Sequence, residues 1–137
     1  MSGNGTNAWN VSFAQISWLQ RLLENHGNVE NLSRSNDIIF TIVRRVQKDT
    51  LRISCLNEYT MSLSDTVRAL DEFGRLDIIY VGGGWCGYSM DAKQYCLDQR
   101  IGLYVTNEMS GGLWKDEYWN QHQRDDKGNT VYDFAKG

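Results

Sequence analysis

The 137-residue sequence contains no proline, and this absence carries no functional indication of its own. The sequence also lacks an apolar run near the roughly 18 residues that a membrane-spanning helix needs, so no membrane partner is expected. Residues Met1–Asn7 are polar and do not have the basic and then apolar form of a signal peptide. These absences together predict a cytoplasmic location.

Cysteine and histidine are scarce, with three Cys and two His in the chain. An odd number of cysteines without a secretory signal is typical of reduced thiols. Zinc sites need paired ligands at short spacing, whereas Cys55, Cys86 and Cys96 are far apart and neither histidine is close to them in sequence. We therefore interpret the cysteines as structural, and a nucleophilic pair of Cys86 with His26 or His122 as a less favoured alternative.

The charge balance is slightly acidic, with 14 basic and 17 acidic residues and a net charge of −3. This balance argues against indiscriminate coating of nucleic acid, which needs a basic surface, but it leaves room for a local basic patch. Arg44 and Arg45, with Lys48 and Arg52 nearby, form the densest basic cluster. Arg44 and Arg45 are therefore candidate phosphate-binding residues, and a solvated strand end is the simpler interpretation.

Length and composition are those of one globular domain, with 41% hydrophobic and 23% charged residues. Residues 1–10 are rich in Gly and Asn and are expected to form a flexible leader. Residues 11–137 are expected to form a single α/β domain, with a core over 11–105 and a C-terminal appendage over 106–137.

The central stretch of the sequence is Leu76–Val105. It begins and ends with short apolar runs rich in β-branched and aromatic residues, which favour buried strands. Glycines and about three turns of helix lie between the runs, with Ser89 as the expected N-cap. A strand, a helix and a second strand in this order predict a parallel βαβ unit.

The elements upstream are predicted from apolar periodicity and from capping residues. They are a helix from Val11 to Gly27, a short strand at Val29–Leu32, a hairpin of Asp37–Val46 with Leu51–Glu58, and a helix from Ser62 to Gly74. A turn at Gln47–Asp49 would pair Val46 with Thr50, so that paired residue numbers sum to about 96. Asp37 would then share a face with Cys55 and Asn57.

Downstream, Thr106–Gly112 is predicted to be a loop and Leu113–His122 to contain a short helix. Asp125–Asn129 is a turn signal before a strand at Thr130–Phe134. The predicted fold is therefore α/β, with a mixed sheet in which a central β-hairpin is followed by the βαβ unit. Helices would cover both faces, and an aromatic C-terminal hairpin would form an appendage.

The tail is rich in aromatic residues, namely Trp114, Tyr118, Trp119, Tyr132 and Phe134. Such residues either close the core or form an interface, where Trp and Tyr are over-represented. An edge hairpin that completes a neighbour's sheet would give a symmetric dimer. We therefore expect a homodimer formed through this segment.

A likeness to a known family rests on the hairpin and on the strands that follow it. Asp37 begins a strand that ends in Arg44-Arg45, and the partner strand reads Leu51-Arg-Ile-Ser-Cys-Leu-Asn-Glu-Tyr59. Ile78-Ile-Tyr-Val-Gly-Gly, Ala92-Lys-Gln-Tyr95 and Ile101-Gly-Leu103 follow. This arrangement resembles the restriction-endonuclease-like superfamily, and within it the Mrr-type core.

The resemblance implies a nuclease scaffold that holds Mg²⁺ through carboxylates and uses a lysine to assist the attacking water. The family's two catalytic positions on the second hairpin strand fall on Cys55 and Asn57, and neither residue is of the expected type. Thiol and amide groups do not replace a carboxylate and a charged amine. We interpret the chain as a non-catalytic module, without a cofactor, that binds nucleic acid or a protein partner.

The alternative interpretation is a metal-dependent nuclease with a rearranged centre. It would use Asp37 as the Mg²⁺ ligand, Glu58 or Glu30 as a second carboxylate, and Lys93 as the catalytic lysine. The family's usual context, defence against foreign DNA or a mobile element, would then apply by analogy of fold.

The glycine-rich segment at 82–84 precedes a helix, and helix N-termini bind anions. Its spacing matches neither the dinucleotide-binding nor the P-loop pattern, so a tight strand-to-helix turn is the simpler interpretation. As a ligand site it would consist of Gly83 and Gly84, with Trp85 and Tyr88 stacking on a ring and Lys93 one turn into the helix. A third hypothesis is a flavodoxin-like domain that binds a small anion at this segment.

Overall fold

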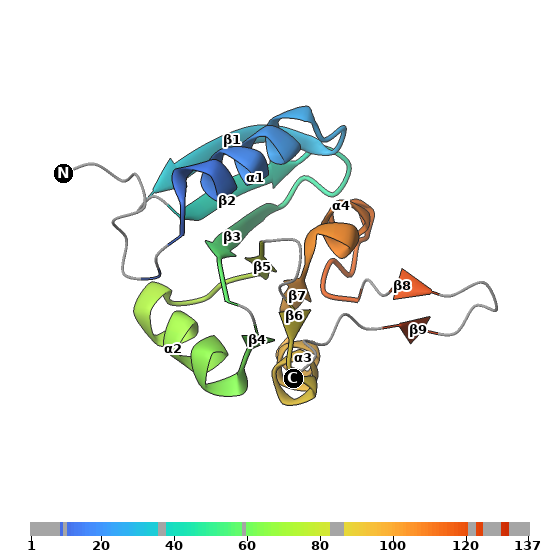
Figure 1. Cartoon of the computed structure of the whole chain (residues 1–137). Helices are drawn as coiled ribbons and strands as arrows, with labels where there is room; N and C mark the ends of the chain where they lie inside the picture. Colours follow the sequence, from blue (N-terminus) through green and yellow to red (C-terminus); the bar gives the residue numbers. More distant parts are fainter. Residues whose placement is uncertain are drawn as a thin grey trace.

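A computed structural model describes residues 9, 11–35, 38–58, 60–82, 87–120, 123–124 and 130–131. Its centre is a five-stranded mixed sheet with the strand order β1-β2-β3-β5-β7 (Figure 1). The strands of this sheet are β1 (Val29–Ser35), β2 (Ile39–Arg44), β3 (Thr50–Leu56), β5 (Ile78–Val81) and β7 (Gly102–Tyr104). The predicted α/β class, with a hairpin leading into a strand-helix-strand unit, is confirmed.

The two halves of the sheet differ in strand direction. β1, β2 and β3 form an antiparallel meander, whereas β5 pairs parallel with both β3 and β7. β2, β5 and β7 are apolar on both faces, because helices cover both sides of the sheet. The hairpin is therefore joined to a parallel unit, and the carboxyl ends of β3, β5 and β7 lie at one edge.

Three helices of the described chain begin after a serine cap, of which Ser62 and Ser89 were predicted and Ser12 was not. α1 (Phe13–Asn25) starts after Ser12, whose hydroxyl accepts from the backbone N–H of Gln15. α2 (Leu63–Phe73) and α3 (Met90–Asp98) start in the same way after Ser62 and Ser89. α1 lies along the antiparallel half of the sheet, and α2 and α3 lie beside each other (Figure 1).

Smaller elements complete the described chain. β4 (Thr60–Met61) pairs parallel with β6 (Gly87–Tyr88), and the sequence did not predict this short sheet. β8 (Gln123–Arg124) pairs antiparallel with β9 (Thr130–Val131), as the predicted C-terminal hairpin requires. The part of the chain that the structure describes contains no helix long and apolar enough to cross a membrane.

The predicted hairpin register is wrong by three. Val43 pairs with Thr50, and the N–H of Arg44 donates to the carbonyl of Asp49, so that paired numbers sum to 93. Residues 45–48 form a longer turn because Asn28 binds it from outside the hairpin. The N–H of Arg45 donates to the backbone carbonyl of Asn28, and the N–H of Val46 donates to its side-chain oxygen. The odd sum removes the basis for placing Asp37 on the face of Cys55 and Asn57.

The segment after β7 also differs from its prediction. α4 (Thr106–Trp114) replaces the expected loop, and the helix expected over Leu113–His122 is absent from the described residues 115–120. Gly112 belongs inside α4 because a Cβ there would lie 2.7 Å from the Cε2 atom of Tyr104. The glycines that indicated a loop therefore serve close packing.

Burial in two elements departs from a simple amphipathic pattern. β3 is buried beyond simple alternation, since Ser54 and Leu56 are both inaccessible to solvent. Val67 in α2 is exposed although it is apolar, and the buried residues of that helix are Thr66 and Ala69. Small side chains on this face of α2 allow the helix to approach its neighbours closely.

Candidate functional site

The structure brings two predicted site residues together near the carboxyl end of β7. Tyr88 on β6 and Lys93 on α3 lie in a buried polar cluster with Glu108 on α4 and Tyr104 on β7. We call these four residues the Glu108 cluster. Ligands of open α/β sheets usually bind at this edge, so the cluster occupies a position from which it can shape a site.

Glu108 organises the cluster although its side chain is completely buried. Its Oε2 atom accepts a hydrogen bond of 2.6 Å from the hydroxyl of Tyr88, and its Oε1 atom accepts one of 3.1 Å from the N–H of Val105. Both carboxylate oxygens therefore have a donor, which is what burial of a charged group requires. The second bond also caps the first turn of α4.

Lys93 lies deeper than a lysine on a surface helix normally does. Its Nζ atom donates a hydrogen bond of 2.7 Å to the carbonyl of Leu103 and lies 4.8 and 4.7 Å from the ring centroids of Tyr88 and Tyr104. Burial lowers the pKa of Lys93, and the charge of Glu108 opposes that shift. A buried amine of this kind is a candidate proton carrier, but its 3% exposure gives it little access to solvent.

The carboxyl end of β3 carries the residues that occupy the nuclease-like positions. Cys55 is completely buried, burial raises the pKa of its thiol to about 12, and its sulfur lies 3.9 Å from the carbonyl of Gln15. Asn57 is exposed. Cys55 is therefore a neutral thiol in the core, unable to act as an anionic ligand of a hard cation.

Glu58 follows directly and is half-buried. Burial raises the pKa of its carboxyl, the charge of Asp65 raises it further, and Arg68 opposes both. These neighbours belong to α2, so Glu58 lies against that helix. Its predicted catalytic role stays a prediction.

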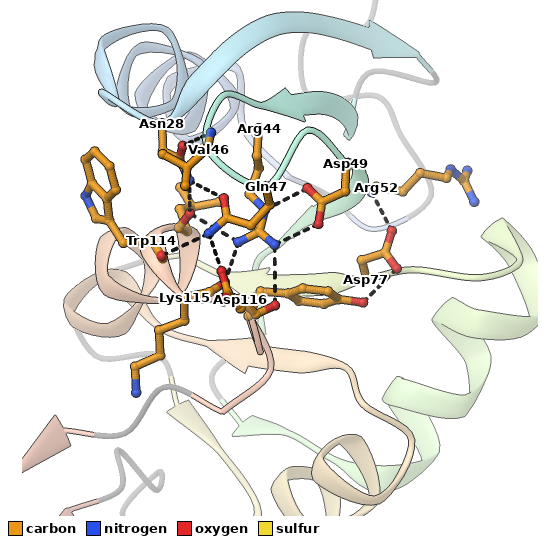
Figure 2. A network of polar contacts seen from close by, with 12 residues as sticks. Asn28, Arg44, Val46, Gln47, Asp49, Arg52, Asp77, Trp114, Lys115 and Asp116 are labelled. Carbon is orange, nitrogen blue, oxygen red and sulfur yellow. Dashed lines mark hydrogen bonds and ion pairs between the residues drawn. The ribbon is translucent and has the colours of Figure 1, made fainter.

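Arg44 and Arg45, the predicted phosphate-binding pair, lie in different environments, and Figure 2 shows that of Arg44. The guanidinium of Arg44 is buried, forms a bidentate pair with Asp49 at 2.8 and 2.7 Å, and donates to carbonyls of the segment 113–116. We call this arrangement the Arg44 network. The Arg44 network leaves the predicted ligand role of Arg44 without geometric support. Arg45 is exposed, and its Nη1 atom lies 4.0 Å from the Oε1 atom of Glu30.

The Arg44 network extends to neighbouring amide side chains. Asn28 donates to Gln47 and to the carbonyl of Leu113, and Gln47 donates to the carbonyl of Trp114. Figure 2 shows these groups gathered between the hairpin turn and the start of the C-terminal segment. The network therefore holds the end of α4 and the residues after it against the hairpin.

The aromatic tail contributes to this junction. Tyr118 is buried, and Arg44 lies 5.5 Å from the centroid of its ring. Trp119 packs edge-on against Tyr118 at 5.1 Å, and Trp114 lies 5.0 Å from His26, the C-cap of α1. These tail aromatics therefore close the core of the same chain, while Tyr132 and Phe134 lie outside the described residues.

Several predicted site residues also lie outside the described residues. They are Asp37, Gly83, Gly84 and Trp85. Within the described ranges, no three His, Cys, Asp or Glu side chains come together as a metal site would require. The predictions for Asp37 as a Mg²⁺ ligand and for the glycine segment as a ligand loop stay predictions.

Sequence reasoning missed Glu108, the residue that joins the cluster. The available signal was its position three residues after Val105, where a glutamate can cap the start of a helix. The Gly111-Gly112 pair concealed this signal because it indicated a loop.

Comparisons with family models, with curated proteins and with solved structures found no match to this chain.

Proposed function

We propose that this chain is a nucleic-acid-binding module built on a restriction-endonuclease-like core that does not cleave its ligand. The observation that carries the proposal is the state of Cys55. The sequence resemblance assigns Cys55 to the place of a metal-binding carboxylate, and Cys55 is a buried thiol whose pKa burial raises to about 12. Phosphodiester cleavage assisted by Mg²⁺ needs oxygen ligands at that place.

The strand order supports the choice of scaffold. An antiparallel hairpin followed by parallel strands is the arrangement that the sequence resemblance implies. The flavodoxin-like alternative gains less support, because β1, β2 and β3 form an antiparallel meander. The Glu108 cluster then has a supporting role, since it fixes β6, α3 and α4 around the edge where a ligand would bind.

A mobility-shift experiment tests the proposal. Single-stranded and duplex DNA and RNA of one mixed 20-nucleotide sequence would be incubated with the protein at low salt in EDTA. We expect shifted bands that weaken as salt increases, because phosphate contacts release counterions. Unshifted bands with all four ligands would contradict the proposal and would favour the protein-partner interpretation.

A further inference from the structure

The exposed side of α1 carries an aromatic ring with a rigid support. Trp18 is 42% exposed although its indole stacks on the ring of Tyr80, with 5.8 Å between centroids and 11° between planes. Tyr80 is 2% exposed. The core therefore supports one face of the indole, while the other face is directed toward solvent.

The support beneath Trp18 is fixed on two sides. The hydroxyl groups of Tyr80 and Thr106 lie 3.0 Å apart, which ties β5 to the first residue of α4. Gly82 lies against the same ring, since a Cβ there would be 3.1 Å from the Cε2 atom of Tyr80. Because Tyr80 is fixed, it gives the indole of Trp18 a rigid surface. Stacking of a ligand ring on Trp18 should therefore cost little conformational entropy.

A cationic residue lies about one helical turn from this indole. Arg21 is exposed and follows Trp18 by three positions, which places the two Cβ atoms about 5–6 Å apart on the helix surface. The nearby carboxylate of Glu24 accepts a hydrogen bond of 3.3 Å from Gln20. An exposed aromatic face with a guanidinium beside it is the combination by which single-stranded nucleic acid is bound, through base stacking and phosphate contact.

From this geometry we infer that Trp18 and Arg21 form a stacking site for an unpaired base of single-stranded DNA or RNA. The inference rests on the proposed function and specifies its ligand. A duplex hides the faces of its bases, so it cannot use the outer face of the indole. Trp18 lies over Tyr80, which is within β5 and is joined to the first residue of α4.

The test is fluorescence anisotropy with a labelled 20-nucleotide single strand and with its duplex, at low salt in EDTA. We expect the single strand to bind more tightly. Trp18→Ala should weaken its binding about tenfold or more, because stacking of one base contributes on the order of 1–3 kcal/mol. Trp18→Phe, which keeps an aromatic face, should recover most of the affinity.

Trp114→Ala is the matched control, because Trp114 is an exposed aromatic residue on α4, outside the proposed site. The affinity of this control should stay within about twofold of wild type. Arg21→Ala should reduce the slope of log affinity against log salt concentration by about one, which corresponds to the loss of one phosphate contact. Thermal unfolding of each variant separates loss of binding from loss of fold, and Trp18→Phe keeps the test valid where Trp18→Ala unfolds.

The outcomes separate the two proposals. Binding by wild type that Trp18→Ala and Trp18→Phe leave unchanged would overturn the stacking site and preserve the binding module. Equal or tighter binding of the duplex would also overturn the stacking site alone. Absence of binding to both probes would overturn both proposals.

Discussion

Two buried cations show how differently this fold treats positive charge. Arg44 pairs with the carboxylate of Asp49 in the hairpin and donates to carbonyls of residues 113–116, which ties the hairpin turn to the end of α4 and the residues after it. Lys93 has a carbonyl, two aromatic rings and a nearby carboxylate, and burial lowers its pKa. The first is a structural junction, whereas the second is a titratable group next to the proposed binding edge.

The largest expected effect is the loss of the Arg44 junction. Arg44→Met should reduce the free energy of unfolding by about 3–5 kcal/mol, because Asp49 and the carbonyls of the segment 113–116 lose their donor. Urea unfolding measures this loss. The neighbouring exposed variant Arg45→Met should change stability by less than about 0.5 kcal/mol, and equal effects of the two variants would contradict the structural role of Arg44.

Removing the carboxylate of the Glu108 cluster should have the next largest effect. Glu108→Ala leaves the N–H of Val105 and the hydroxyl of Tyr88 without their acceptor, so we expect a loss of about 3 kcal/mol. Glu108→Gln, which retains an acceptor, should lose less. The exposed Glu117→Ala is the control, and a similar loss there would show that the effect does not depend on the cluster.

Tyr88→Phe removes one hydrogen bond of the same cluster and should cost about 1.5 kcal/mol. Combined with Glu108→Ala, Tyr88→Phe should add little further loss of stability, since both changes break the same hydrogen bond. A double-mutant cycle by urea unfolding measures this coupling. Fully additive losses would contradict the hydrogen bond between the two side chains.

The lowered pKa of Lys93 predicts a pH dependence in the alkaline range. Between this folded-state pKa and the ordinary value of 10.5, the unfolded chain binds more protons than the folded chain, so this residue makes stability rise with pH. The stability of wild type relative to Lys93→Met should therefore increase as pH approaches 10.5. A difference that stays constant or falls over that range would contradict the lowered pKa.

The smallest expected effect concerns Glu58, whose pKa is raised by burial and by Asp65. Because the unfolded chain ionises first, wild type loses stability relative to Glu58→Gln as pH rises above the ordinary value of 4.5. The variant should be slightly more stable than wild type near neutral pH and equal to it in acid. Thermal unfolding at several pH values measures the difference, with Glu117→Gln as the exposed control.

The local signals in the sequence predicted most of the fold. Apolar periodicity located α1, serine caps and the stop at Gly74 located α2 and α3, and the two apolar runs located β5 and β7. These features depend on neighbouring residues only, so a single sequence contains them. The mixed sheet and the predicted class followed from their order.

Long-range contacts caused the failures. The hairpin register depends on Asn28, which binds the turn from outside the hairpin, and α4 depends on a glycine that fits against Tyr104. The burial of Arg44 depends on carbonyls about 70 positions later in the chain. The same limit applied to the site, where Tyr88 and Lys93 were predicted and Glu108 on α4, which bonds to Tyr88 and whose charge acts on Lys93, was not.

The most direct test of the central claim is a cleavage time course. Labelled single-stranded and duplex DNA and RNA would be incubated with wild type and with Asp37→Ala in Mg²⁺, in Mn²⁺ and in EDTA. We predict bound but intact ligand in every condition for both proteins. Metal-dependent products from wild type that disappear in Asp37→Ala would contradict the claim and would establish a nuclease with a rearranged centre.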